Sequence, residues 1–238
     1  MSLILKKILD IYLRCYRRVF IFLKGKPSDL VIKQRFIGHA RYHCQYAENS
    51  MQLYDYLVNE LHYEMVECDI QFDNNDNPFL AYRECEINNK SVKLGEMLDF
   101  AKKKGVVVML DFLHTKLSVK RCYLIYRLLC KKHMESQVIL ADGKIPYFAM
   151  FYPFFTYQKE LPWSIAAVKY AERQKMYGNI ILSLPYKNEN IDQYKDIVDM
   201  AHRLGVFMKV SIINDNDIAK RFIQIGTDLI ITDEIVNE

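Results

Sequence analysis

The sequence predicts an α/β protein whose main part is a closed (β/α)8 barrel, the TIM barrel, preceded by an amphipathic helix. Three observations predict it: apolar runs alternate with helical patterns, eight such runs can be counted, and 238 residues is the usual size of one such barrel. Hydrophobic residues make up 51% of the chain, which is enough for a large core. We expect residues 1–30 to form a basic helix with its linker and residues 31–238 to form the barrel.

Positive charge is concentrated at the start of the chain. Residues 1–35 carry nine basic and two acidic side chains, a net charge of +7, whereas the whole chain carries +4. Projected at 100° per residue, the charges of residues 3–24 gather on one side, which predicts one amphipathic helix. The opposite side holds Leu5, Ile8, Tyr12, Tyr16, Val19 and Leu23.

Two alternatives for this helix stay open. It could lie in an anionic membrane surface, as a peripheral contact through residues 3–24, or it could pack on the barrel or on a second copy. It carries too many charges to span a bilayer, since a span needs about 20 residues with few charges. Nucleic acid is not an expected partner, because the basic residues stop where the predicted barrel begins.

Eight apolar runs are the predicted strands of the barrel. They are Phe36–His39, Glu64–Ile70, Val106–Phe112, Val138–Ala141, Tyr147–Phe151, Ile180–Leu184, Phe207–Ser211 and Leu229–Thr232. Ser50 is a natural N-cap for the helix that follows the first run, and Gly105 and Gly205 stand where helices should end. One join is too short, because residues 142–146 cannot make a parallel crossover between the fourth and fifth runs.

Carboxylates stand at the ends of two predicted strands. Glu67 and Asp69 are two residues apart on one strand and therefore point the same way. Two neighbouring carboxylates repel unless a cation lies between them, and hard oxygen ligands suit Mg²⁺ or Ca²⁺. Asp111 and His39 also end strands, where functional side chains of parallel barrels gather. The alternatives are a solvated strand face for the pair and a turn cap for Asp111.

The spacing of these residues resembles a known family. His39, then Glu48-Asn49-Ser50, then Glu67-x-Asp69 resemble the His-Arg-Gly, Glu-Asn-Thr and Glu-x-Asp signature of the glycerophosphodiester phosphodiesterases. The far end agrees: Gly205 to Met208, Asn214-Asp215 and Gly226-Thr227-Asp228-Leu229-Ile230-Ile231-Thr232-Asp233 are similar to that family's closing pattern. The resemblance extends over about residues 36–235, with a poorly matched middle.

The resemblance implies a barrel of the phospholipase C-like phosphodiesterase type and an enzyme of lipid metabolism. Its reaction would be metal-dependent hydrolysis of glycerophosphodiesters or related phospholipid head groups, so that the substrate is a glycerophosphodiester or a lysophospholipid. A divalent cation, Mg²⁺ or Ca²⁺, would be held by Glu67, Asp69 and Asp111. His39 would transfer protons, while Glu48 and Asn49 complete the motif.

The sequence also departs from the family's pattern. The Arg after the first His is absent, because Ala40 and Arg41 follow His39, and the family's second His is replaced by Tyr82. Tyrosine has an unperturbed pKa near 10 against about 6.5 for histidine, and loss of a general acid or base typically costs about 10² to 10⁴ in rate. The candidate replacements are His114 and His43 for proton transfer and Arg41, Arg83 and Lys209 for phosphate binding, although such side chains are usually solvated.

Two functions therefore remain in view. One is a phosphoric diester hydrolase whose activity Tyr82 would weaken or abolish, and the other is a catalytically impaired barrel that binds phosphate, lipid head groups or a protein partner at a membrane. A scaffold with neither metal nor ligand ranks last. The six cysteines form no Cys-x-x-Cys pair and no cleavable signal is evident, so we expect reduced thiols and a cytoplasmic protein, with membrane contact, if any, peripheral and at the inner face.

Overall fold

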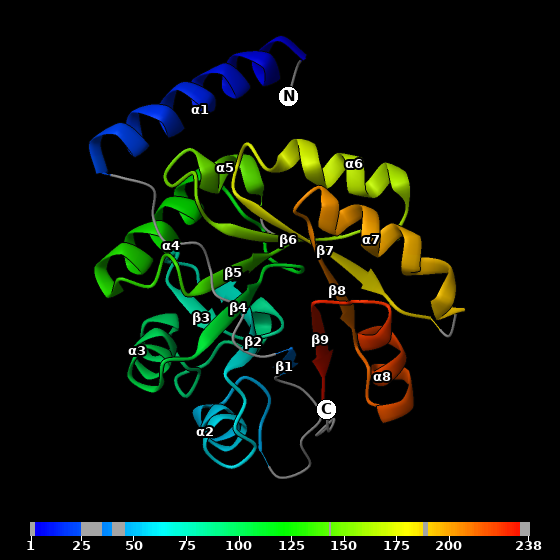
Figure 1. The fold of residues 1–238 in the computed structure, drawn as a ribbon. Helices are drawn as coiled ribbons and strands as arrows, with labels where there is room; N and C mark the ends of the chain where they lie inside the picture. Colours follow the sequence, from blue (N-terminus) through cyan, green and yellow to red (C-terminus); the bar gives the residue numbers. More distant parts are fainter. Residues whose placement is uncertain (1–2, 25–34, 40–45, 143, 188–189, 234–238) are drawn as a thin grey trace.

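Eight parallel strands form a closed barrel in the computed structural model, which describes residues 3–24, 35–39, 46–142, 144–187 and 190–233 (Figure 1). Around the ring the order is β1, β2, β4, β5, β6, β7, β8 and β9, and β1 pairs with both β2 and β9. The strands are β1 (Phe36–Gly38), β2 (Met65–Phe72), β4 (Val107–Asp111), β5 (Val138–Ala141), β6 (Thr156–Glu160), β7 (Asn179–Pro185), β8 (Phe207–Ser211) and β9 (Leu229–Thr232). The predicted (β/α)8 fold is confirmed.

Helices cover the outside of the ring and follow the strands along the chain. They are α2 (Met51–Asn59), α3 (Leu94–Lys104), α4 (Val119–Lys132), α5 (Ile145–Ala149), α6 (Ile165–Gln174), α7 (Lys195–Arg203) and α8 (Asn216–Gln224), with 3-10 turns η1 (Glu84–Glu86) and η2 (Ile191–Tyr194). A further helix, α1 (Leu3–Lys24), precedes the first strand. As predicted, Ser50 caps α2 by accepting a hydrogen bond from the Leu53 amide, and Gly105 ends α3 at φ 70°. A short strand that was not predicted, β3 (Pro78–Leu80), adds to β2 in antiparallel fashion.

The predicted strand Tyr147–Phe151 is wrong. Residues 145–149 form the short helix α5 instead, and β6 begins only at Thr156, where it pairs in parallel with β5 and β7. Pro146 in the first turn favours the helix, because its fixed φ suits that position and its missing N–H is not needed there. The longer connection also supplies the chain that a parallel crossover requires.

The inside of the barrel changes from apolar to charged along its axis. An apolar cluster fills the lower interior: Ile37, Met65, Val107, Met109, Ile139, Ala141, Ile181, Leu229 and Ile231. Alternation along β2 puts Met65, Glu67 and Asp69 inside, whereas Val66 and Cys68 pack outward against the helices. Charged side chains therefore occupy the interior only toward the carboxyl ends of the strands.

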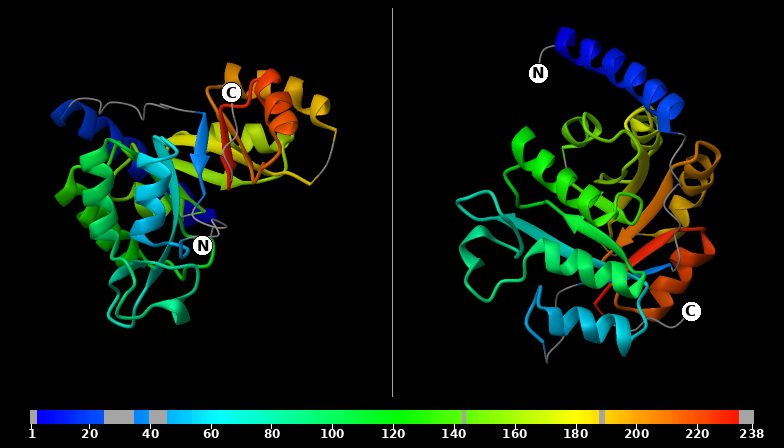
Figure 2. Two further views of the ribbon diagram at one scale, coloured as in Figure 1. Left: turned by 90° about the horizontal axis from the view of Figure 1, so that it is seen from below. Right: turned by 90° about the vertical axis from the view of Figure 1, so that its left-hand side faces the viewer.

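Helix α1 lies outside the ring of barrel helices and packs beside α5 and α6, as Figure 1 and the right-hand view of Figure 2 show. Leu13 is fully buried in this contact. The Tyr16 hydroxyl donates to the Phe151 carbonyl at 3.0 Å, and the Arg17 guanidinium donates to the Lys175 carbonyl at 2.7 Å. Phe151 precedes β6 and Lys175 precedes β7, so α1 contacts the amino-terminal end of the barrel. No helix in the described part of the chain is long and apolar enough to cross a bilayer.

Replacement of Gly178 by alanine should destabilise the barrel. An added Cβ at Gly178 would lie 2.1 Å from the Phe155 carbonyl oxygen and 2.8 Å from Tyr157 Cε2, so β6 and β7 would have to separate. We expect the free energy of unfolding in urea to fall by about 1–3 kcal/mol, the usual cost of overpacking. Gly95→Ala is the matched control, because its nearest atom is at 3.8 Å and alanine favours the helix. Equal stability of the two variants would contradict this account.

Candidate functional site

A hollow of about 220 Å³ opens at the carboxyl ends of the strands. Seven of the eight barrel strands or the residues that follow them contribute to it. Its lining comprises His39, Glu67, Asp69, Tyr82, Met109, Asp111, Leu113, Asp142, Gln158, Glu160, Lys209, Ser211, Ile212 and Ile231. Most of these side chains are polar or charged, unlike the apolar cluster beneath them.

Three carboxylates meet in this hollow. Oxygen atoms of Glu67, Asp69 and Asp111 all lie within 4.8 Å of one another. Strand register brings them together, since Asp69 on β2 is directly paired with Asp111 on β4. Glu67 and Asp69 are buried. Three oxygen donors so close together could hold a hard divalent cation, which would also relieve their repulsion.

The electrostatics of Asp111 reflect this crowding. Burial, followed by the negative charges of Asp69 and Asp142, raises the pKa of Asp111 to about 6, against a hydrogen bond that its carboxylate accepts from the Leu113 amide at 2.7 Å. A neighbouring cation would favour the ionised carboxylate and so oppose that shift.

Asn49 holds Asp69 in place from the loop before α2. Its Nδ2 donates to Asp69 Oδ2 at 3.0 Å, and its Oδ1 accepts from the Asp69 amide at 3.1 Å and from the Tyr54 hydroxyl at 3.0 Å. Asn49 has a positive φ of 54°, a conformation that asparagine tolerates better than most residues. In the predicted Glu48-Asn49-Ser50 motif, Asn49 thus orients a carboxylate, Ser50 caps a helix, and Glu48 is exposed.

His39 is oriented by a residue from the far end of the chain. Its Nδ1 lies 2.5 Å from Asp233 Oδ1, and its Nε2 lies 3.6 Å from Glu67 Oε2. Asp233 is itself fixed by Asn214, whose Nδ2 donates to Asp233 Oδ2 at 3.0 Å. One ring nitrogen therefore faces a carboxylate partner while the other faces the acidic cluster.

Lys209 on β8 is the buried cation of the hollow. It is 2% exposed, and its Nζ donates to Ser211 Oγ at 3.1 Å. Burial lowers the pKa of Lys209 to about 8, against the charges of Asp111, Glu67, Glu160 and Asp142, which favour the charged ammonium. The sequence left open whether Lys209 faces inward, and in the structure its side chain lines the hollow.

Tyr82 and His114 are brought together at the mouth. Tyr82 lines the hollow, and the ring of His114, in the loop after β4, stands edge-on to it with ring centroids 4.6 Å apart. The backbone of Tyr82 is fixed by Gln71, whose Nε2 donates to the Tyr82 carbonyl at 3.0 Å. His114 itself is exposed and does not line the hollow. Arg41 and His43, two further candidates, lie outside the described residues.

Several residues of the hollow or its supports were missed by sequence reasoning, among them Gln158, Glu160 and Asp233. The first two belong to β6, the strand that was misplaced. Gln158 is 4% exposed, and its Oε1 is buried without a hydrogen-bond partner among the described residues. Asp233 stood in the matched closing pattern, which could have singled it out, but nothing in that pattern showed that it would reach His39.

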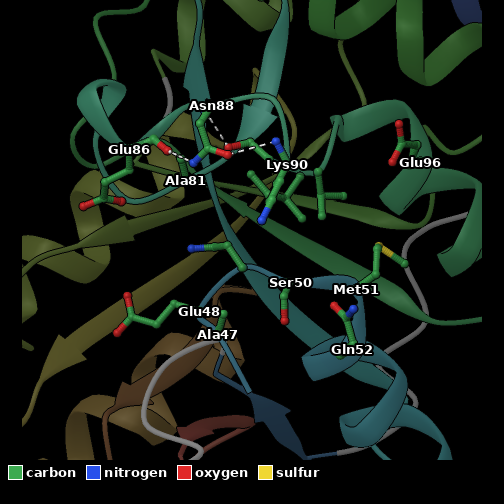
Figure 3. A pocket seen from close by; sticks show the side chains of 14 residues that line it. Ala47, Glu48, Ser50, Met51, Gln52, Ala81, Glu86, Asn88, Lys90 and Glu96 are labelled. Carbon is green, nitrogen blue, oxygen red and sulfur yellow. Dashed lines mark hydrogen bonds between the residues drawn. The ribbon is translucent and has the colours of Figure 1, made fainter. Parts of the chain in front are cut away.

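A second hollow of about 480 Å³ lies beside the first, between the start of α2 and the segment from β3 to α3 (Figure 3). Glu48, Ser50 and Gln52 border it on one side, and Glu86 and Lys90 on the other. Asn49 also lines this hollow while it bonds to Asp69, so the two hollows share a wall.

Comparisons with known proteins reveal similarity of structure only. No family model matches the chain, and no curated protein matches it significantly. Among solved structures, a provisionally named glycerophosphoryl diester phosphodiesterase from Silicibacter pomeroyi DSS-3 is similar at TM-score 0.69 and 14% identity, over 90% of this chain and 93% of that one. A glycerophosphodiester phosphodiesterase from Parabacteroides distasonis ATCC 8503 gives 0.66 and 15%, over 84% and 92%. An Oleispira antarctica phosphodiesterase, solved with the product sn-glycerol-3-phosphate, gives 0.68 and 13%, over 84% and 93%. At these identities the similarity establishes the barrel fold.

Asn49→Ala should destabilise the folded protein by about 2–4 kcal/mol, because it leaves the Asp69 amide and the Tyr54 hydroxyl buried without their acceptor. Urea unfolding measures the change. Asn49→Gly removes the same hydrogen bonds but accepts the positive φ, so it should be milder by about 1 kcal/mol. Wild-type stability of both variants would show that Asn49 does not position Asp69.

Proposed function

We propose that the protein is a metal-dependent phosphodiesterase that hydrolyses glycerophosphodiesters to glycerol phosphate and an alcohol. The observation that supports this most is the meeting of Glu67, Asp69 and Asp111 with His39 at the carboxyl ends of a barrel. The same residues carry the sequence resemblance to glycerophosphodiester phosphodiesterases, and solved structures with that name share the fold. A product complex of one similar protein contains sn-glycerol-3-phosphate, which supports this substrate class.

The donor set fits a divalent cation. Glu67, Asp69 and Asp111 offer hard oxygen atoms from two adjacent strands, the ligand type that Mg²⁺ and Ca²⁺ prefer. When bound, such an ion neutralises phosphate oxygens and makes the phosphorus easier to attack. Asn49 supports the site because its hydrogen bonds fix Asp69 before any ligand arrives.

His39 is the group that we assign to proton transfer. Its Nδ1 partner Asp233 fixes the orientation of the ring, in the manner of a histidine held by a carboxylate. Its Nε2 points to the acidic cluster, where the phosphodiester would lie, and can take a proton from the attacking oxygen or return one. Hydrolysis also needs a proton for the departing alkoxide. We assign its delivery to Tyr82, which lines the hollow, or to His114, whose ring packs edge-on against Tyr82.

The rest of the hollow supplies contacts for the substrate. The buried ammonium of Lys209 would bind a phosphate oxygen, a role that the missing Arg beside His39 leaves open. Gln158 Oε1, buried and without a partner among the described residues, would accept a hydrogen bond from a glycerol hydroxyl. The hollow of about 480 Å³ beside Asn49 has room for the alcohol part of the substrate. This part would lie between the start of α2 and the segment from β3 to α3 (Figure 3).

A second candidate function is a binding module with impaired catalysis. The observation that favours it is Tyr82, which stands at the mouth where the resembling family has its second histidine. In this case the barrel would bind a phosphate or lipid head group, or a partner at a membrane, and would not turn it over. Binding of glycerol phosphate is common to both candidates, whereas turnover separates them.

Metal-dependent hydrolysis is the decisive test of the enzyme. Purified protein is assayed on glycerophosphodiesters and on a lysophospholipid, with Mg²⁺, Ca²⁺ or chelator. We expect hydrolysis that chelator abolishes and that the double variant Glu67→Gln, Asp69→Asn lowers by about 10² or more, since the ion supplies several kcal/mol of charge stabilisation.

The control for that variant is Glu172→Gln, Asp196→Asn, which makes the same chemical changes at two exposed helix positions and should keep full activity. Activity that persists in the site variant would refute the assigned metal ligands. No turnover by wild-type protein on any of these substrates would refute the enzyme and leave the binding module.

Lys209→Met should weaken binding of sn-glycerol-3-phosphate at least about tenfold, because the phosphate loses a charged partner within a site rich in carboxylates. Titration calorimetry measures the dissociation constant, and circular dichroism checks that the variant is folded. Lys169→Met, at an exposed position on α6, is the matched control and should bind as wild type does. An unchanged dissociation constant for Lys209→Met would remove Lys209 from the phosphate site.

A further inference from the structure

Helix α1 has two apolar faces, and the barrel covers only one of them. Leu9, Leu13, Tyr16 and Phe20 face the barrel and are buried or half-buried. Next to this buried arc, six large apolar side chains remain exposed: Ile8, Ile11, Tyr12, Val19, Phe22 and Leu23. Ile21 is also exposed but lies apart from these six around the helix. Phe22 is 87% exposed and Leu23 70%, and the six residues form one contiguous outward stripe of apolar surface on α1.

The outward stripe follows the helical repeat. At 100° per residue, the six apolar residues occupy about a third of the circle, next to the arc that holds Leu9, Leu13, Tyr16 and Phe20. The basic side chains of Lys7, Arg14 and Arg18, all exposed, form a row along one edge of the stripe. An apolar surface with a basic edge on a helix of 22 residues is the pattern of a helix that lies in the interface of a membrane.

Charge favours lipid over a second copy of the chain. The acidic residue in the described part of α1 is Asp10, and its carboxylate already accepts a hydrogen bond from the Tyr177 hydroxyl on the barrel side. Two stripes packed against each other would therefore bring no free carboxylate from α1 to Lys7, Arg14 and Arg18, whereas anionic head groups would pair with them.

We propose that α1 docks the protein on a membrane surface rich in anionic lipid, through its outward stripe, and holds the mouth of the barrel away from that surface. The orientation follows from the contacts of α1 with the segments that precede β6 and β7, at the amino-terminal end of the barrel. The hollow that contains Glu67 lies at the carboxyl ends of the same strands. This proposal does not depend on hydrolysis.

Two exposed cysteines at opposite ends of the barrel make the orientation measurable. Cys15 lies within the outward stripe, and Cys85 lies in η1, three residues after Tyr82 at the mouth. Two labelled proteins are prepared with an environment-sensitive dye, one with Cys85→Ser and one with Cys15→Ser, both with Cys44→Ser and Cys130→Ser so that the remaining Cys68 and Cys122 are buried. Each is titrated with vesicles of phosphatidylcholine, with and without phosphatidylglycerol.

We expect a blue shift from Cys15 with phosphatidylglycerol vesicles, weaker binding at high salt, and no shift from Cys85. Shifts at both sites would overturn the orientation. No binding to phosphatidylglycerol vesicles in cosedimentation would overturn the docking, and a Cys15 shift that grows with protein concentration in the absence of lipid would assign the stripe to self-association instead.

Substitution within the stripe provides the matched test on the unlabelled full chain. Phe22→Ser, Leu23→Ser should lower the fraction that cosediments with phosphatidylglycerol vesicles, with a partition coefficient reduced about tenfold or more. Ile165→Ser, Tyr170→Ser removes two exposed apolar side chains from α6 and should leave the partition coefficient unchanged. Equal partitioning of the two double variants would refute the stripe as the docking surface.

Discussion

The register between β2 and β4 is the constraint on which the rest of the site depends. It pairs Asp69 with Asp111, and the two-residue period of β2 adds Glu67 to the same interior. Three carboxylates above an apolar floor repel one another, so the surrounding side chains must offset their charge or orient them. Asn49 donates to Asp69, His39 faces Glu67, and Lys209 is buried nearby although burial lowers its pKa. Each of these side chains offsets or orients the acidic centre, and a one-residue slip of β4 against β2 would turn Asp111 out of that centre.

Most of the fold could be predicted because seven strands are apolar runs bounded by turn or helix signals. The missed strand, β6, fails that description: its inward positions are Thr156, Gln158 and Glu160, and Tyr157 packs outward in the core. A strand that faces a polar site therefore lacks the apolar run by which strands are recognised. The aromatic residues of 147–151 were mistaken for that strand, although they pack around a short helix. β6 was missed because polar residues such as Gln158 and Glu160, which line the hollow, interrupt the apolar pattern by which a strand is predicted.

Sequence reasoning expected His39, Glu67, Asp69 and Asp111 at one end of the barrel, because strand ends meet there in a parallel barrel, and all four line the hollow. It could not find the pairing of His39 with Asp233, which are 194 residues apart. That contact exists only because β9 closes the ring against β1, and closure is a property of the whole sheet. The edge-on packing of His114 on Tyr82 could not be predicted either, because it depends on the conformation of two loops, and hydrophobic periodicity carries no information about loops. The gathering of strand-end residues at one end of the barrel was therefore predictable, whereas individual side-chain pairings between distant parts of the chain were not.

Helix α1 shows why amphipathicity alone left two alternatives open. The charge pattern was read as one apolar side, whereas the structure divides the apolar residues between the barrel and the outward stripe. Packing and surface contact are thus compatible, because they use different faces of one helix. The position of α1 then constrains the substrate. The contacts of α1 lie before β6 and β7, whereas the acidic cluster lies at the carboxyl ends of the strands. If α1 lies on a lipid surface, a lipid in that bilayer would have to carry its head group past the wall of the barrel to reach the cluster. A substrate that arrives from water, a glycerophosphodiester without acyl chains, fits this arrangement better than a lysophospholipid held in the membrane.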